Sequence, residues 1–400
     1  MTAAADNAPV KAEDRRALVV ACGAHALHDG YTDLIYVMLP IWQHEFGLGF
    51  AALGLMKTVF SGTLAGLQIP AGFLAERFGT PLVLALGTAL AGLGYCLAGF
   101  STGVAALAAA LFVGGLGAST QHPLASALIA QAFAGTRSLR ALGTYNFAGD
   151  IGKMTVPAAA SLLFVVLPWR EALILLGGLG VLAAIVIYVL IPRFAAETAA
   201  APKPAQSARG GARLGQFGFP LLLSVGVIDS ATRMAFLTFL PFVLTAKGAS
   251  LPTIGLALTL VFAGGAAGKL VCAFIGARIG AVATVWLTEA MTALGIVALL
   301  PLSLAAALML LPLVGIALNG TSSVLYGSVP DLVAPARRQR AFGIFYTGTI
   351  GAGAVSPAIY GLLGDAVGVP SALVIVAAVV LLTLPITLAL RPALANVPAS

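Results

Sequence analysis

The chain is built mainly from apolar runs of about 20 or more residues, separated by short charged, Gly-rich or Pro-rich breaks. A run of this length forms a helix that crosses the ~30 Å hydrocarbon core of a bilayer. Twelve such runs can be placed between residues 17 and 390. Only 9% of the residues are charged and 60% are hydrophobic, whereas about 25% of a soluble domain is charged. The sequence therefore predicts an all-α membrane protein with twelve transmembrane helices.

The runs form two similar halves. Charged, glycine and proline positions recur 200 residues later, so that Arg137, Arg140, Gly143 and Pro157 correspond to Arg337, Arg340, Gly343 and Pro357. Such a repeat is typical of transporters built from two parallel bundles, so we expect two pseudo-symmetric six-helix bundles around a central cavity. The expected segments are an N-terminal tail at 1–16, a first bundle at 17–192, a linker at 193–216, a second bundle at 217–390 and a C-terminal tail at 391–400.

Basic residues concentrate on one side of the predicted membrane. With the N-terminus inside, the tails, linker and inner loops hold almost all Lys and Arg outside the runs, and the outer loops hold only Arg170 and Lys247. Positive residues accumulate on the cytoplasmic side of membrane proteins, so both tails and the linker are expected to be cytoplasmic. The net charge of +7 is therefore attributed to orientation rather than to nucleic-acid binding.

The first run carries ionisable residues that are costly inside a membrane. Asp29 and Asp33 share it with His25 and His28, and a carboxylate at the centre of a membrane helix costs about 2.5–3.5 kcal/mol. Helical spacing puts His25, Asp29, Asp33 and Tyr36 near one face, which we interpret as the wall of a solute cavity. Two carboxylates one turn apart repel each other at low dielectric, so we expect the pair to bind a proton near neutral pH, tuned by the two histidines. The structural alternative is a carboxylate held by a Lys or Arg of another helix.

Two further runs carry both signs of charge. On the fifth run, Asp150 and Lys153 either pair with each other, or Lys153 is the counter-ion of a first-run carboxylate or an anion site. On the seventh run, Asp229 and Arg233 either pair locally or place Arg233 near Asp33, to which it corresponds in the repeat. In a two-bundle fold the first and seventh spans face one cavity.

Other polar residues within the runs are weaker candidates for solute contact. They are Tyr36, His122, Asn146, Asn319, Ser323, Tyr326 and Tyr346. Their hydroxyl and amide groups could equally join helices. Lys57 and Lys269 lie toward the ends of their runs and are expected to extend to the interface. Glu289 lies in the middle of its run without an obvious partner.

A metal site is an alternative interpretation of the histidines. His25, His28, Asp29 and His122 are of residue types that ligate divalent transition metals. The spacing of His25 and Asp29 suits ligation from one helix face. The basic residues of the fifth and seventh runs would oppose a bare cation.

The loop after the second run has a recognisable pattern. Gly72, Glu76, Arg77 and Gly79 follow the spacing G-x-x-x-D-R-x-G, with Glu in place of Asp, and a degenerate copy containing Arg278 ends the eighth run. With this loop and its six-plus-six runs, the chain resembles the major facilitator superfamily. The resemblance implies that the loop latches the two halves on the cytoplasmic side.

Three stretches resemble the fosmidomycin-resistance-like branch of that superfamily. They are the pattern His25-x-x-x-Asp29, residues 39–46 (LPIWQHEF) and residues 115–123 (GLGASTQHP). The resemblance implies proton-driven efflux of small polar compounds, including an anionic phosphonate drug.

The sequence contains no ATP-binding loop, dinucleotide fingerprint, hydrolase elbow or zinc-protease helix, so we expect no cofactor and a proton gradient as the energy source. We predict a secondary transporter of a bacterial inner membrane, not an enzyme, that works by alternating access. Its partners would be a small anionic or zwitterionic solute, protons and lipid but no nucleic acid, and the resemblance implies a monomer that performs efflux. Proton-symport uptake of an organic anion, transport of a divalent metal or metal chelate, and a non-transporting receptor are alternatives.

Overall fold

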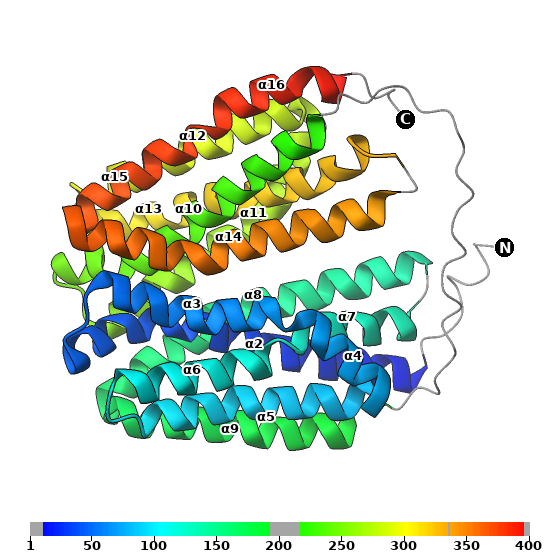
Figure 1. The fold of residues 1–400 in the computed structure, drawn as a ribbon, viewed down its shortest axis with the longest axis vertical. Coiled ribbons are helices and arrows are strands. Elements are labelled where there is room, and N and C mark those ends of the chain that lie inside the picture. The colour runs from blue at the N-terminus through cyan, green and yellow to red at the C-terminus, as the bar shows by residue number, and fades with distance from the viewer. Residues whose placement is uncertain (1–10, 134, 193–216, 335–336, 396–400) are drawn as a thin grey trace. The chain divides into compact units, whose positions relative to one another are not determined.

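A computed structural model describes residues 11–133, 135–192, 217–334 and 337–395, and every regular element in these ranges is a helix (Figure 1). The predicted all-α class is confirmed. The predicted linker at 193–216 lies outside the described residues, as do residues 1–10 and 396–400 of the tails.

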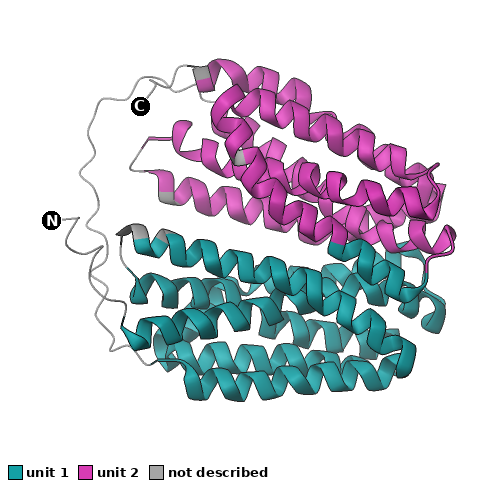
Figure 2. Cartoon of the chain, turned by 180° about the vertical axis from the view of Figure 1, so that it is seen from behind, with its two compact units in different colours: residues 1–197, 250–259 teal, residues 198–249, 260–400 magenta. Residues whose placement is uncertain are grey.

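The chain divides into two compact units, residues 1–197 with 250–259 and residues 198–249 with 260–400 (Figure 2). The first unit contains α2 (Ala12–Phe46), α3 (Phe50–Gly66), α4 (Gln68–Phe78), α5 (Thr80–Gly99), α6 (Val104–Ala118), α7 (Gln121–Ala132), α8 (Gly135–Val166) and α9 (Trp169–Leu190). The second contains α10 (Gly218–Ala246), most of α11 (Leu251–Ile279), α12 (Ala281–Leu299), α13 (Leu304–Ser328), the short η1 (Val329–Asp331), α14 (Arg338–Val367), α15 (Val369–Val380) and α16 (Thr383–Ala395).

Most helices are long and apolar enough to cross a membrane. Within the described chain ten segments meet this requirement of length and hydropathy, and the pair α3–α4, bent by 46°, makes eleven if it counts as one span. α2 is 35 residues long, but its His and Asp residues lower its hydropathy below that of the others. With α2 as the first span, and with α6–α7 and α15–α16 as one span each, the helices match the twelve predicted spans.

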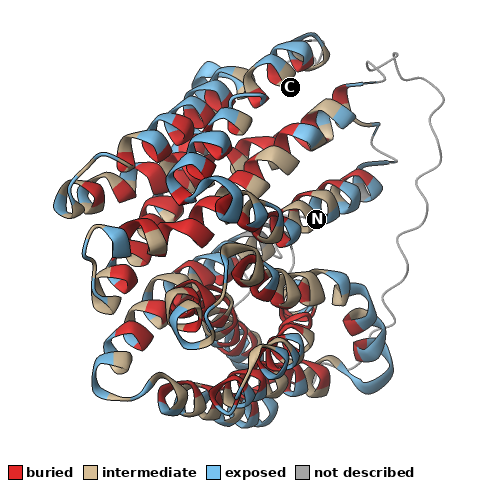
Figure 3. Ribbon diagram, turned by 60° about the vertical axis from the view of Figure 1, so that its left-hand side comes forward, coloured by how far each residue is buried: buried red, intermediate tan, exposed pale blue. Residues whose placement is uncertain are grey.

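Burial separates an inner and an outer side of the helices. Figure 3 shows buried positions concentrated where helices of one unit pack together. Large apolar side chains, among them Val166, Val189 and Leu270, are exposed. A helix surface of this kind suits contact with lipid tails.

Glycines set the close approach of α2 and α8. A Cβ atom at Gly152 would lie 1.8 Å from the carbonyl oxygen of Ala26, so no larger residue fits there. In the second unit α10 packs against α14 in the same way, and a Cβ at Gly226 would lie 2.7 Å from Cζ of Phe345. The first and fifth spans therefore pack closely in each half, so the two halves share this contact.

The predicted loop motif joins α4 to α5. Gly79 lies between these helices with a φ of +87°, and Gly280, which follows α11, has a φ of +83°. A side chain disfavours this backbone conformation, so both halves preserve the same glycine requirement. Arg278 lies in the last turn of α11. The other motif residues lie on α4 and are Gly72, Glu76 and Arg77.

Candidate functional site

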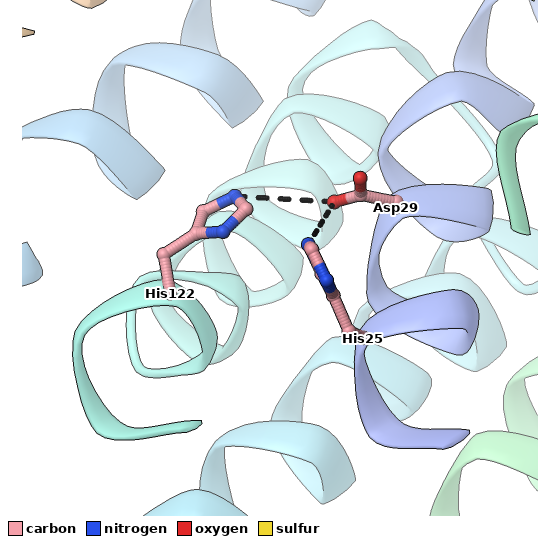
Figure 4. Close-up of side chains that lie close together, drawn as sticks. All are labelled: His25, Asp29 and His122. Carbon is pink, nitrogen blue, oxygen red and sulfur yellow. Dashed lines mark ion pairs between the residues drawn. The ribbon is translucent and has the colours of Figure 1, made fainter. Parts of the chain in front are cut away.

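Asp29 is the centre of a buried cluster of ionisable side chains in the first unit. Its Oδ1 lies 3.3 Å from Nε2 of His25 and 3.9 Å from Nε2 of both His28 and His122. Its Oδ2 lies 3.2 Å from Nζ of Lys153. Figure 4 shows His25 and His122 pointing toward the same carboxylate oxygen from different helices. The structure thus brings together five residues that the sequence analysis selected.

A hydrogen bond fixes the tautomer of His25. Its Nδ1 lies 2.9 Å from the main-chain carbonyl oxygen of Tyr145, and because a carbonyl only accepts, Nδ1–H is the donor. In a neutral ring, Nε2 then keeps a lone pair, which faces the Asp29 oxygen 3.3 Å away. Two lone pairs repel, so this contact is favourable only when a proton or another cation lies between the two atoms.

His28 and His122 complete the surroundings of this oxygen. Their ring centroids are 4.9 Å apart and the rings are nearly perpendicular, at 87°. The Nε2 atoms of His25 and His28 are buried without a hydrogen-bond partner. A buried polar atom without a partner costs about 1–3 kcal/mol. The cluster therefore has unused capacity to bind a proton or a cation beside Asp29.

Gly149 of α8 makes room for the cluster. A Cβ atom at this position would lie 2.6 Å from Oδ2 of Asp29 and 2.7 Å from Cε1 of His25. Together with Gly152, it gives α2 a stretch of bare backbone to pack against. This close packing allows Lys153, the next residue of α8, to reach Asp29 on α2.

Lys153 forms an ion pair with Asp29. The neighbouring Asp150 is buried and also attracts Lys153 electrostatically, whereas Asn146 on the same helix is exposed. Of the two interpretations of Lys153, the geometry favours a counter-ion of the first-span carboxylate. The side chains of Lys153 and His122 are 30% and 31% exposed, so the cluster opens on their side.

The buried position of Lys57 was not predicted from the sequence. We expected it to extend to the membrane interface, but it is 2% exposed and that expectation is wrong. Its Nζ donates to the carbonyl oxygen of Thr32 at 2.8 Å and lies 4.5 Å from the ring centroid of Tyr36. It also interacts electrostatically with the buried Asp33. These partners on α2 stabilise the ammonium group inside the unit. The sequence offered one signal for this contact: Asp33 has no cation near it on its own helix.

The second unit holds a smaller polar group on α10 and α13. Nη2 of Arg233 donates to Oδ2 of Asp229 at 3.4 Å, and Nη1 donates to Oδ1 of Asn319 at 3.5 Å. The local Asp229–Arg233 pair is therefore formed. The expected proximity of Arg233 to Asp33 would join the two units, and it stays a prediction.

The remaining predicted residues lie on α13 and α14. The hydroxyl groups of Tyr326 and Thr349 are 3.4 Å apart, and the Tyr326 ring centroid lies 6.4 Å from that of Tyr346. Ser323 is partly buried on α13. These contacts tie the two helices together, and they leave the predicted solute contacts of these side chains untested.

Comparison with known proteins agrees with this architecture. The family model described as Major Facilitator Superfamily matches residues 21–223 and 222–399. The chain belongs to the Major Facilitator Superfamily. The fosmidomycin resistance protein of Escherichia coli (strain K12) is 26% identical over 349 residues, which cover 86% of this chain and 84% of that protein. This match confirms the resemblance to the fosmidomycin-resistance-like branch.

Other matches are more distant or shorter. A protein described as a probable sulfoacetate transporter, SauU of Cupriavidus necator, is 31% identical over 144 residues, or 36% of this chain and only 33% of that relative. Among solved structures, a bacterial homologue of the human lysosomal transporter Spinster, in an inward-facing and occupied conformation, has a TM-score of 0.79 at 14% identity. That match covers 98% of this chain and 100% of the other. This member of the superfamily is thus a multi-pass membrane transporter of small molecules and not an enzyme.

Proposed function

We propose that this transporter couples the movement of a small anionic or zwitterionic solute to protons, and that the Asp29 cluster binds the coupling proton. The supporting observation is that the two oxygen atoms of the Asp29 carboxylate have different partners. One oxygen is paired with Lys153, and the other faces the Nε2 lone pair of His25. The proton gradient supplies the energy, and no cofactor takes part. The protein acts as a monomer in a bacterial inner membrane with both termini in the cytoplasm.

A proton on Asp29 removes the counter-charge of the Lys153 ammonium group. The ionised carboxylate neutralises the ammonium group, which is partly shielded from water. Protonation removes the negative charge of the pair, so Lys153 then needs another anion, which the solute supplies. When the proton leaves, Asp29 pairs with Lys153 again and the solute anion is released. Asp33 and Lys57 adjust the charge beside this pair, while Arg233 offers the second unit's anion contact.

The charge of the solute decides the direction of coupling. A zwitterion whose positive group occupies the position of the proton at Asp29 excludes the proton, which gives proton-driven efflux by exchange. We propose efflux of a zwitterionic solute first, because the match to the fosmidomycin resistance protein spans most of both chains. A simple anion instead binds together with the proton, which gives uptake by symport. The Lys153–Asp29 geometry supports this second candidate, and the similarity to SauU, described as a probable sulfoacetate transporter, supports an anionic solute. In either case alternating access moves the solute between the two sides.

Proteoliposomes with an imposed pH gradient test the proposal. The probes are the anions fosmidomycin and sulfoacetate and a zwitterionic aminophosphonate, and the gradient is applied in both directions. Asp29→Asn is expected to abolish gradient-driven accumulation while leaving solute exchange, and Asp33→Asn is expected to weaken it. The matched control is Glu45→Gln, which removes an exposed carboxylate paired with Arg170 at 2.7 Å in the same unit. Normal accumulation by Asp29→Asn would refute the proton assignment.

A divalent metal ion is the other cation that the cluster could accept. The ligand atoms of His25, Asp29 and His122 all lie within 4.8 Å of one another, and His25 is oriented by the Tyr145 carbonyl as metal-bound histidines are. The Lys153 ammonium group beside Asp29 opposes such an ion. Addition of Zn²⁺, Ni²⁺ or Mn²⁺ during thermal unfolding separates the cases. Stabilisation that is lost in His122→Ala would favour metal or metal-chelate transport over the proton proposal.

A further inference from the structure

Glu289 of α12 is the most deeply buried acidic side chain described in the second unit. It is 1% exposed, and its Oε1 has no hydrogen-bond partner. Among the described residues no cation lies within ion-pair distance of it. Arg233 acts on it only at longer range and is already bonded to Asp229. A buried carboxylate without a paired cation is strongly unfavourable, so the neutral acid fits these surroundings better.

A chain of hydroxyl groups leads away from Glu289. Glu289 hydrogen-bonds with the side chain of Thr321, whose Oγ1 donates to Oγ1 of Thr288 at 2.7 Å. Thr288 in turn donates to the carbonyl oxygen of Thr284 at 3.0 Å. Each hydroxyl carries one proton. If Thr321 donates to Thr288, it can therefore only accept from Glu289, and this arrangement suits the protonated acid.

The donors and acceptors in this series of hydroxyl groups can also be reversed. If Thr288 donates to Thr321, then Thr321 donates to an ionised Glu289, and the Thr284 carbonyl keeps its helical hydrogen bond. The two threonines thus support both states of the acid by rotating their hydroxyl groups. A permanently neutral residue such as Gln would need no such adjustable partners.

We propose that Glu289 is a second proton-binding site of this transporter, located in the second unit and separate from the Asp29 cluster. Its charged neighbours are Asp229 and Arg233 of α10. Of the helices packed against α12, α13 has no charged residue and Tyr326 as its one titratable side chain, α15 has no ionisable residue, and α16 has only Arg391, which is exposed. A proton that enters or leaves Glu289 therefore acts mainly on the Asp229–Arg233 pair.

This arrangement gives the proton a role in solute binding, a step that rests on the proposed function above. Two carboxyl groups lie near one guanidinium group. When both are ionised, Arg233 is fully neutralised and has no attraction left for an anion. When Glu289 holds a proton, Arg233 faces one carboxylate only, and its exposed side can attract the anionic group of a solute. Glu289 would thus couple a proton to the anion contact of the second unit.

Infrared difference spectra of the reconstituted protein, recorded between acidic and alkaline pH, test the site without any solute. We expect a carbonyl band of a protonated carboxylic acid that is present in wild type and in Asp29→Asn but absent in Glu289→Gln. Thr321→Val should shift this band, because the acid loses its acceptor. Thr292→Val, which alters another buried threonine of α12, should not. Identical pH-difference spectra of wild type and Glu289→Gln would overturn the proposal, whether the acid stays ionised or permanently neutral.

Transport measurements then separate this proposal from that for Asp29. With fosmidomycin and sulfoacetate as probes, reversal potentials should show fewer protons moved per solute in Glu289→Gln, while exchange persists. An unchanged proton count in Glu289→Gln, with accumulation lost in Asp29→Asn, refutes only the second site. A lower proton count in Glu289→Gln, with normal accumulation in Asp29→Asn, refutes only the Asp29 assignment. If Glu289→Gln does not fold, the band shift in Thr321→Val decides the outcome.

Discussion

Nζ of Lys153 lies 3.2 Å from Oδ2 of Asp29, which joins α8 to α2 inside the first unit. Side-chain exposures of 30% and 9% place this ion pair between a surface pair and a fully buried one. We expect Lys153→Met to lower the free energy of unfolding by about 1–3 kcal/mol, because it leaves the Asp29 charge without its counter-ion. Equilibrium unfolding in detergent micelles measures this loss.

The double variant Asp29→Asn with Lys153→Met is the control for that measurement. Removing both charges should restore much of the stability but not proton-driven transport. A double-mutant cycle without any coupling energy would show that the two side chains do not interact in the membrane protein.

Gly152 packs against the backbone of α2, so its substitution should be more harmful than helix propensity suggests. A Cβ there would lie 1.8 Å from the Ala26 carbonyl oxygen, which is backbone and cannot rotate away. We expect Gly152→Ala to destabilise the protein by more than the ~1 kcal/mol that alanine otherwise gains over glycine in a helix. Gly143→Ala on the same helix is the matched control, since nothing lies within 4 Å of a Cβ added at that position. Equal unfolding temperatures of the two variants would contradict the close packing of α2 and α8.

Lys57 should be sensitive to loss of charge rather than to loss of length. Lys57→Met keeps an unbranched side chain but removes the cation that lies beside Tyr36 and Asp33. We expect about 1–3 kcal/mol of lost stability, because a hydrogen bond is lost and the buried Asp33 loses its nearby cation, together with weaker proton-driven accumulation. Lys57→Arg should keep more activity than Lys57→Met. Full transport by Lys57→Met would exclude a role for this residue in coupling.

Gly79 should not tolerate a side chain, because its φ is +87° and its ψ is 139°. We expect Gly79→Ala to cost about 1–3 kcal/mol of backbone strain, visible as a lower unfolding temperature. Gly72→Ala lies in the same motif, where nothing is within 4 Å of an added Cβ, and it should be nearly neutral. If both variants unfold alike, the motif glycine at position 79 is not retained for its conformation.

The sequence by itself determined the class of the protein. Runs of apolar residues must form helices in a bilayer, because no water is present there to satisfy the backbone. The 200-residue repeat made two similar halves predictable, and the cost of burying Asp29 and Asp33 marked α2 as the candidate functional helix. These features depend on local composition and spacing, which a single chain displays directly.

Only the tertiary structure decided which side chains meet. Lys153 on α8 reaches Asp29 because Gly149 and Gly152 let α8 approach α2 closely, and His122 reaches it from α7. Lys57 turns inward because its partners lie on another helix, and spacing along α3 cannot show this. Contacts between helices depend on how their faces pack, so charge pairing inside the membrane is fixed by the fold and not by the periodicity of any one segment.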